Sequence, residues 1–236
     1  ELKEKFFNGC KKNNHSIEKV QKIWSDWESF AAYAFNKSHS TCYSVLAFYT
    51  AYLKAHYPSE FMSSVLTHHI NDIKKLGFYL EECKRMSISI LGPDINESFM
   101  QYSVNSSGQI RFGLEAIKGV GSAAAEFIIN ERKKNGNYAD IFDFFKRMDS
   151  RLTNKRVFEA LVLGGGFDSL TNSKRSIFFN ENEKNEMFLE RLIKFGSAYR
   201  KQIQVPTLIP IDESISIPKV PNVDPWDHLI KLKKEK

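Results

Sequence analysis

Prolines are distributed very unevenly along this chain. Only Pro58 and Pro93 occur in the first 200 residues, whereas five of the seven prolines lie between residues 202 and 225. Proline breaks a helix interior, so long helices are compatible with the first part and not with the second. Apolar side chains in residues 1–86 recur at helical spacing. This spacing predicts an all-helical bundle with helices over residues 2–12, 17–35, 38–56, 58–68 and 71–86, the last capped by Asn71.

The pattern changes after residue 86. Residues 87–91 form a short β-like run that ends at Gly92 and Pro93, and residues 101–105 and 109–113 flank a Ser-Ser-Gly turn typical of a small hairpin. Helical spacing then returns. It predicts helices over residues 121–134, 138–148, 154–163 and 174–201, an extended linker over 202–225, and a short basic helix over 226–236.

Composition restricts the class of protein more than it identifies one. The chain has 42% hydrophobic residues and 19 phenylalanines, enough for one or two cores, and its net charge of +6 is compatible with a polyanionic partner. Its three cysteines, Cys10, Cys42 and Cys83, form no CxxC pair, which favours free thiols in a reducing cytoplasm. We see no membrane-length apolar run or targeting peptide, and a start at Glu1 within a helix suggests part of a longer chain.

The strongest local signal is the Gly-x-Gly turn at residues 116–121, followed by small residues that open a helix. Glycine lets the backbone approach a ligand closely, and the free N–H groups at a helix start attract anions. We expect a DNA backbone to be bound here, independently of base sequence, by Lys118, Gly119, Val120, Gly121 and Ser122. The simpler interpretation is an ordinary tight turn between packed helices.

A second helix followed by glycines lies about forty residues further on, in residues 152–170. Its candidate backbone contacts are Lys155, Arg156 and Gly165. Two such units in succession resemble a tandem helix-hairpin-helix domain, which grips duplex DNA. The second copy lacks the hydrophobic-Lys-Gly-x-Gly form, so it can instead be the packing half of the pair.

The start of the helix predicted near residue 38 is a second candidate anion site. Asn36, Ser38, Ser40 and Thr41 are possible caps, and Lys37 and His39 add charge at the positive helix end. Tyr43 lies one turn beyond His39 on the same face. Asn36, Lys37, Ser38, His39 and Tyr43 are therefore candidate nucleotide-binding residues. The alternative is a capped helix with solvated polar side chains.

Several runs resemble the C family of bacterial replicative DNA polymerases. They are FNKSHS at 35–40, YLKAHYPSEFM at 52–62, EECKRM at 81–86, GPDIN at 92–96, GLEAIKGVG at 113–121, NKRV at 154–157 and GFD at 166–168. The similarity covers about residues 1–170 in unbroken order. It implies a mainly α fold divided into a fingers segment (1–98), a tandem helix-hairpin-helix region (99–170), a helical extension (171–201), a linker (202–225) and the start of another helix (226–236).

The resemblance implies template-directed DNA synthesis with primer-template DNA, deoxynucleoside triphosphates, other replicase subunits and two Mg²⁺ ions as partners. The family's metal-binding carboxylates lie upstream of the fingers, and no matching motif occurs here. Asp94 and Asp168 belong to other matched segments. We therefore assign no catalytic or metal-binding residue and expect this part to be inactive alone. The rival classes are a repair nuclease or ligase, whose metal-carboxylate or nucleophilic-lysine motif is not found, and a non-catalytic DNA-repair or protein-interaction scaffold.

Overall fold

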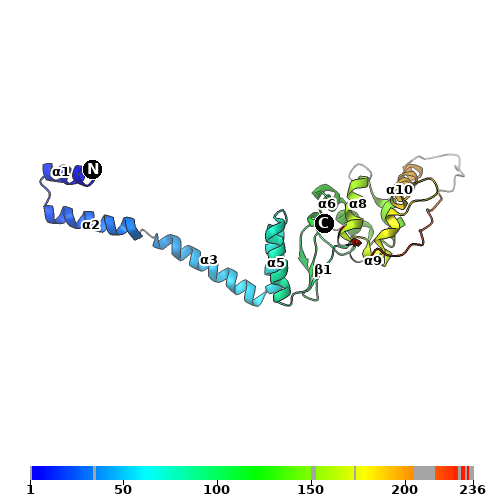
Figure 1. Ribbon diagram of the computed structural model, residues 1–236, viewed down its shortest axis with the longest axis horizontal. Coiled ribbons are helices and arrows are strands. Elements are labelled where there is room, and N and C mark those ends of the chain that lie inside the picture. Colours follow the sequence, from blue (N-terminus) through cyan, green and yellow to red (C-terminus); the bar gives the residue numbers. More distant parts are fainter. Residues whose placement is uncertain are drawn as a thin grey trace. The chain divides into compact units, whose positions relative to one another are not determined.

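The computed structural model describes residues 2–33, 36–149, 153–172, 174–204, 216–227, 230, 231 and 233. Contacts divide the chain into two compact units, residues 1–56 and 57–236. The fold is mainly helical with one small sheet, as predicted (Figure 1). The helices of the first unit are α1 (Leu2–Lys12), α2 (Ile17–Tyr33) and α3 (Lys37–His56).

The elements of the second unit follow in chain order. They are α4 (Pro58–His68), α5 (Ile73–Arg85), β1 (Ile90–Leu91), β2 (Ser103–Val104), β3 (Ile110–Arg111), the 3-10 helix η1 (Leu114–Ala116), α6 (Ser122–Asn135), α7 (Ile141–Arg147), α8 (Lys155–Gly164), α9 (Asp168–Thr171), the 3-10 helix η2 (Arg175–Phe179) and α10 (Phe188–Gln204).

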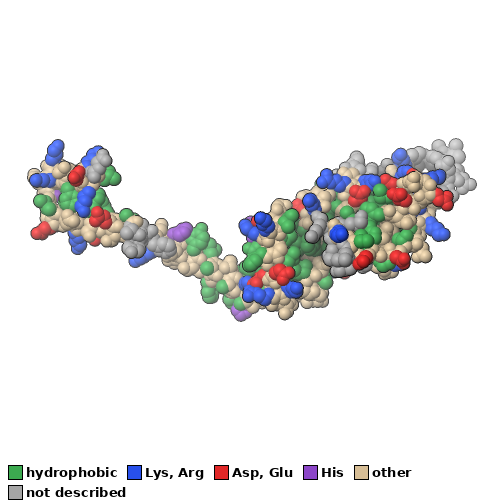
Figure 2. Space-filling model, in the orientation of Figure 1, with side chains coloured by type: hydrophobic (Ala, Val, Ile, Leu, Met, Phe, Trp, Pro, Cys, Tyr) green, Lys and Arg blue, Asp and Glu red, His purple; other side chains and the backbone are tan. Residues whose placement is uncertain are grey.

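In the first unit, α1 and α2 pack through aromatic rings. Phe6 lies between Trp24 and Trp27, with ring centroids 5.5 Å and 4.9 Å away. Among the described residues of this unit, Val20 is the one buried apolar side chain. Helix α3 has no described residue that is buried, and its exposed apolar side chains include Phe48 and Tyr49. Hydrophobic side chains along this part of the chain are green in Figure 2.

The second unit contains a three-stranded sheet with the order β1-β3-β2. β1 runs parallel to β3, and β2 pairs with β3 antiparallel, so the predicted hairpin is confirmed. Helices α4 and α5 share a small core with this sheet, formed by Met62, Leu66, Cys83, Tyr102 and Ile110. Helices α4 and α5 therefore pack against strands that follow residue 98, the predicted end of the fingers segment.

The larger core lies among η1, α6, α7, α8, η2 and α10. Its buried side chains include a cluster of phenylalanine rings, with Phe144 and Phe167 centroids 4.9 Å apart. Buried aromatic rings of this kind contribute large apolar areas to a core. This cluster holds together the segments that carry both glycine turns.

Two predicted helix starts are wrong for reasons of side-chain hydrogen bonding. The cap of α5 is Asp72, whose carboxylate accepts the Lys75 N–H at 3.2 Å, and not Asn71. Helix α7 starts at Ile141 because Asp140 accepts the Asp143 N–H at 2.7 Å. In both cases a cap residue places the boundary more narrowly than apolar spacing does.

The helix predicted over residues 174–201 is also wrong in its first half. Residues 175–179 form η2, and Glu181 pairs with Met187 across a turn. The Asn182 side chain accepts the N–H groups of Lys184 and Glu186, which favours a turn over a helix. Helix α10 begins only at Phe188.

The predicted linker lies partly in α10, which extends to Gln204, and partly in residues 205–215, outside the described residues. Residues 216–227 contain no helix or strand. Ser176 donates a hydrogen bond to the Asp224 carbonyl at 2.7 Å, and Phe179 stacks on Trp226. Trp226 and Asp227 are thus not helical, and most of the rest of the predicted terminal helix lies outside the described residues.

Candidate nucleic-acid interface

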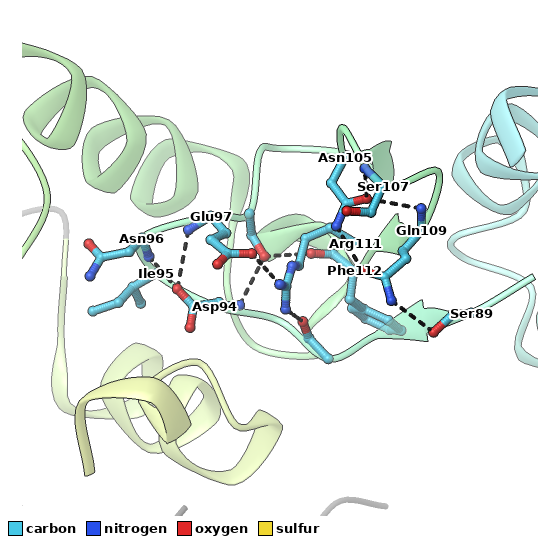
Figure 3. Close-up of polar contacts among 12 residues, drawn as sticks. Ser89, Asp94, Ile95, Asn96, Glu97, Asn105, Ser107, Gln109, Arg111 and Phe112 are labelled. Carbon is cyan, nitrogen blue, oxygen red and sulfur yellow. Dashed lines mark hydrogen bonds and ion pairs between the residues drawn. The ribbon is translucent and has the colours of Figure 1, made fainter. Parts of the chain in front are cut away.

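A turn at residues 94–98 is hydrogen-bonded to Phe112, at the end of the segment that leads into the first glycine turn (Figure 3). Asp94 accepts the N–H groups of Asn96 and Glu97 at 2.7 Å and 3.2 Å. Its own N–H donates to the Ser98 hydroxyl, which donates to the Phe112 carbonyl at 2.6 Å. The carboxylate of Asp94 therefore stabilises a turn that is joined directly to the residue before Gly113.

Arg111 secures the same turn from the adjacent strand. Its guanidinium donates to the Gly92 carbonyl at 2.9 Å and contacts the Glu97 carboxylate (Figure 3). From the other side, the buried Arg132 of α6 donates to the Ile95 and Ser98 carbonyls at 2.6 Å and 2.9 Å. Burial lowers the pKa of Arg132. These bonds hold the direction of α6 relative to the turn.

The first glycine turn joins η1 to α6 at the positions predicted from sequence. Gly119 has φ +101°, a conformation that favours glycine, and Lys118, Gly119, Gly121 and Ser122 are all exposed. Val120 is different because its side chain is buried and its N–H donates to the Ile117 carbonyl at 3.0 Å. Val120 therefore anchors the turn in the core.

The N-terminus of α6 has the geometry of an anion site. Gly121 is its N-cap and makes no side-chain capping bond, and an α-helix leaves its first N–H groups without partners inside the helix. The helix dipole adds partial positive charge at this end. Lys118 lies three residues before the cap and is exposed. The turn can therefore receive an anionic group without first breaking a capping bond.

One carboxylate lies at this helix start. Glu115 of η1, which is half-buried, accepts a hydrogen bond from the hydroxyl of Ser122, the first residue of α6. The predicted contact residue Ser122 is thus already engaged in the free chain. Nothing in the spacing of the sequence indicated this bond.

The two glycine turns pack against each other through α8. A Cβ placed on Gly119 would lie 3.2 Å from the Ala160 Cβ, and one on Gly164 would lie 3.0 Å from Ile117. These close approaches join the first turn to the helix of the second. The geometry is that of two helix-turn-helix units sharing one core.

The second turn is built differently from the first. Gly165 has φ +93° and ends α8, while its N–H donates to the Val162 carbonyl and the Gly166 N–H donates to Leu161. This is the pattern that closes a helix C-terminus. Gly165 is buried, so its N–H is used within the protein. This structure favours the packing role that the sequence left open for the second turn.

A guanidinium lies over the second turn. Arg175 donates to both Asp168 oxygens at 2.7 Å and 2.6 Å and to the Leu163 carbonyl at 2.7 Å. A Cβ on Gly165 would lie only 2.2 Å from an Arg175 nitrogen. The buried side chain of Arg175 thus fills the space beside Gly165. Among the described residues, no charged side chain lies that close to Gly119 in the first turn. Sequence reasoning missed Arg175 because its partners are seven and twelve residues away.

The cations at the start of α8 differ in their surroundings. Lys155 forms an ion pair with Glu190 of α10 at 2.8 Å and approaches Glu159 at 3.8 Å. The hydrogen bond with Glu190 raises the pKa of Lys155. Arg156 is exposed. Asn154 caps the helix by accepting the Val157 N–H at 3.1 Å, so its side-chain oxygen is already bonded.

The candidate nucleotide residues form the start of α3. Asn36 accepts the His39 N–H at 3.1 Å, which makes Asn36 a cap. Lys37, Ser38 and His39 are exposed, and the rings of His39 and Tyr43 lie 4.4 Å apart. The structure therefore brings the five predicted residues together on one helix end.

The described residues do not fit a catalytic Mg²⁺ site. Among them, no three His, Cys, Asp or Glu side chains group together as metal ligands. Asp94 accepts backbone N–H groups, and Asp168 pairs with Arg175. Both carboxylates have structural roles. Among the same residues, no helix is long and apolar enough to cross a membrane.

Comparison with known proteins identifies the class of this region. A family model described as a helix-hairpin-helix motif matches residues 87–177, the range that holds both glycine turns. Residues 87–177 of the second unit are therefore a helix-hairpin-helix region. This match agrees with the two packed turns and their shared core.

Relatives that match more than two thirds of the chain then identify the family. The chain is 40% identical over 190 residues to the DNA polymerase III subunit alpha of Borreliella burgdorferi, covering 80% of this chain and 16% of that protein. It is 43% identical to the subunits of Aquifex aeolicus and Escherichia coli K12, covering 74% and 70% of this chain and 15% and 14% of those proteins. The chain belongs to the DNA polymerase III alpha family, which confirms the resemblance, and spans about one-sixth of these relatives.

Proposed function

We propose that this chain is the part of a replicative DNA polymerase that holds duplex DNA by its sugar-phosphate backbone. The observation that carries this proposal is the exposed start of α6, where a glycine cap leaves helix N–H groups open beside Lys118. The helix-hairpin-helix match and the named relatives support it. Binding through backbone N–H groups and lysine contacts phosphates, so it is independent of base sequence.

The two turns have unequal roles in this proposal. The first turn binds phosphate through the start of α6 and Lys118. The second turn supports it from the side, because the N–H groups of Gly165 and Gly166 already donate to the Val162 and Leu161 carbonyls. Arg156, at the exposed start of α8, can add a contact to the DNA backbone. Lys155 is already in an ion pair with Glu190. In this proposal the start of α6, with Lys118, is the principal phosphate-binding site, called the phosphate grip below.

The test is duplex binding by the 236-residue chain over a series of salt concentrations. We expect Lys118→Glu combined with Gly119→Ala to weaken binding and to reduce the salt slope by about one to two, since each lost phosphate contact removes about 0.9. The matched control is Lys84→Glu with Gly77→Ala on α5, where a Cβ meets no atom within 4 Å. Equal affinities for the wild type and the Lys118→Glu, Gly119→Ala variant would overturn the assignment of DNA binding to the first turn and favour a protein-interaction scaffold.

We further propose that the α3 start binds the triphosphate of an incoming nucleotide. Lys37 and His39 are exposed on the first helical turn, where Asn36 accepts the His39 N–H, and Tyr43 offers a ring beside His39. In the complete polymerase, Lys37→Ala should raise the apparent KM for nucleotides about tenfold with little change in DNA affinity, as expected for a lost charged hydrogen bond. Lys54→Ala at the other end of α3 is the control. An unchanged KM would make the helix start structural.

Chemistry in this proposal belongs to the complete polymerase. The carboxylates among the described residues do not form a metal site, so we assign the Mg²⁺ ions to residues outside this chain. The chain by itself is expected to bind DNA without extending a primer. Primer extension by the isolated chain would contradict this assignment.

A further inference from the structure

The carboxylate of Glu115 lies where the proposed phosphate grip begins. Glu115 belongs to η1, and its side chain accepts a hydrogen bond from the hydroxyl of Ser122 at the first position of α6. Ser122 follows the cap Gly121, which makes no side-chain capping bond of its own. A carboxylate bonded at this helix start therefore comes from a different element of the same chain.

A carboxylate at a helix N-terminus is favourable for the same reason that a phosphate is. The partial charge of the open N–H groups attracts any anion, within about the first turn. In the free chain, the Glu115 carboxylate lies at this helix start through its hydrogen bond from the Ser122 hydroxyl. When a phosphate approaches, the two negative charges repel, and the hydroxyl can no longer serve both. The side chain therefore opposes the ligand that the turn attracts.

We propose that Glu115 is a built-in competitor that sets how tightly the first turn holds DNA. This inference rests on the proposed function, because it concerns the same phosphate grip. Binding requires the carboxylate to give up its bond to Ser122 and to tolerate a phosphate nearby. The grip is therefore weaker than Lys118 and the α6 start alone would make it, and the difference depends on electrostatic screening.

The experiment measures duplex affinity for Glu115→Gln, which keeps the shape of the side chain and removes its charge. At about 50 mM salt we expect about fivefold tighter binding, the size of a close charge repulsion in water. At about 300 mM salt the gain should fall below about twofold, because screening shortens the range of the repulsion. Glu115→Asp, which retains the charge, should remain near the wild-type affinity.

Glu126→Gln is the matched control. Glu126 is an exposed carboxylate on α6, one turn beyond Ser122. The Glu126→Gln variant therefore changes the net charge as much as Glu115→Gln does, without altering the first glycine turn. We expect a smaller gain than for Glu115→Gln. Equal gains for the two variants would show a general charge effect, and no gain for Glu115→Gln would also overturn the inference.

Two outcomes separate this inference from the proposed function. If Lys118→Glu with Gly119→Ala weakens binding and Glu115→Gln changes nothing, the grip stands and the competitor fails. If neither variant changes the affinity, the grip itself is assigned to the wrong turn. Far-UV circular dichroism of each variant verifies that the helices remain folded.

Discussion

Gly119 and Gly165 both have positive φ angles, but their surroundings impose different demands. A Cβ on Gly119 would meet one methyl group, that of Ala160, at 3.2 Å. A Cβ on Gly165 would lie 2.2 Å from the Arg175 guanidinium and 3.0 Å from Asp168. The first position therefore requires mainly backbone freedom, and the second also requires space for a buried charge.

We predict that Gly165→Ala destabilises the second unit more than Gly119→Ala does. The left-handed conformation costs alanine about 1 kcal/mol at either position. At Gly165 the methyl group also displaces the buried Arg175 guanidinium from the partly exposed Asp168, which adds about 1 to 3 kcal/mol. Urea unfolding gives both free energies.

Gly77→Ala is the control for these glycine variants. Gly77 lies within α5, has no atom within 4 Å of an added Cβ, and is exposed. Alanine should stabilise the helix there by up to about 1 kcal/mol. A loss of stability at Gly165 no larger than that at Gly119 would contradict the role given to Arg175.

Between elements, the contact of Lys155 with Glu190 joins the start of α8 to the first turn of α10. Glu190 also accepts the Met187 N–H at 3.1 Å, so one carboxylate stabilises a helix start and an interhelical ion pair. The hydrogen bond from Lys155 is the main cause that lowers the pKa of Glu190 below its ordinary 4.5. Both groups are solvent-accessible, and salt will weaken their attraction.

The sign of the pH effect follows from the direction of this shift. A carboxyl whose folded pKa is lowered contributes stability above its unfolded pKa and loses it as pH falls through the folded value. We predict that NMR titration places the Glu190 pKa below 4.5 and that Lys155→Met moves it upward. An unshifted Glu190 in the wild type would contradict the ion pair.

At the scale of the whole molecule, the two compact units differ in how many of their described apolar side chains are buried. The second unit contains both apolar cores, which include Leu114, Phe158 and Phe167 in one and Met62 and Tyr102 in the other. The first unit buries only Val20 among its described apolar side chains and exposes Trp27 and Phe30. The features proposed for duplex binding therefore lie in the better-packed unit, and those proposed for nucleotide lie on α3.

Helix positions could be predicted from local pattern where spacing and caps agree. α4 begins at Pro58, α6 follows the glycine turn, and α8 is capped by Asn154. The prediction was wrong for residues 174–187 because Asn182 bonds to nearby N–H groups and makes a turn. Hydrogen bonds of this kind, from backbone N–H groups to a nearby side chain, compete with helix formation. The spacing of apolar residues does not reveal them.

The sequence by itself determined the helical class, the small hairpin, the first glycine turn with Lys118 and the polymerase family, because each depends on short runs of neighbouring residues. Only the tertiary structure decided that the two turns are unequal. Arg175 closes the second turn, and Glu115 reaches the first through Ser122. These contacts join separate elements, and the folded backbone brings their partners within bonding distance. Spacing along the chain cannot specify such contacts, since long-range packing sets them.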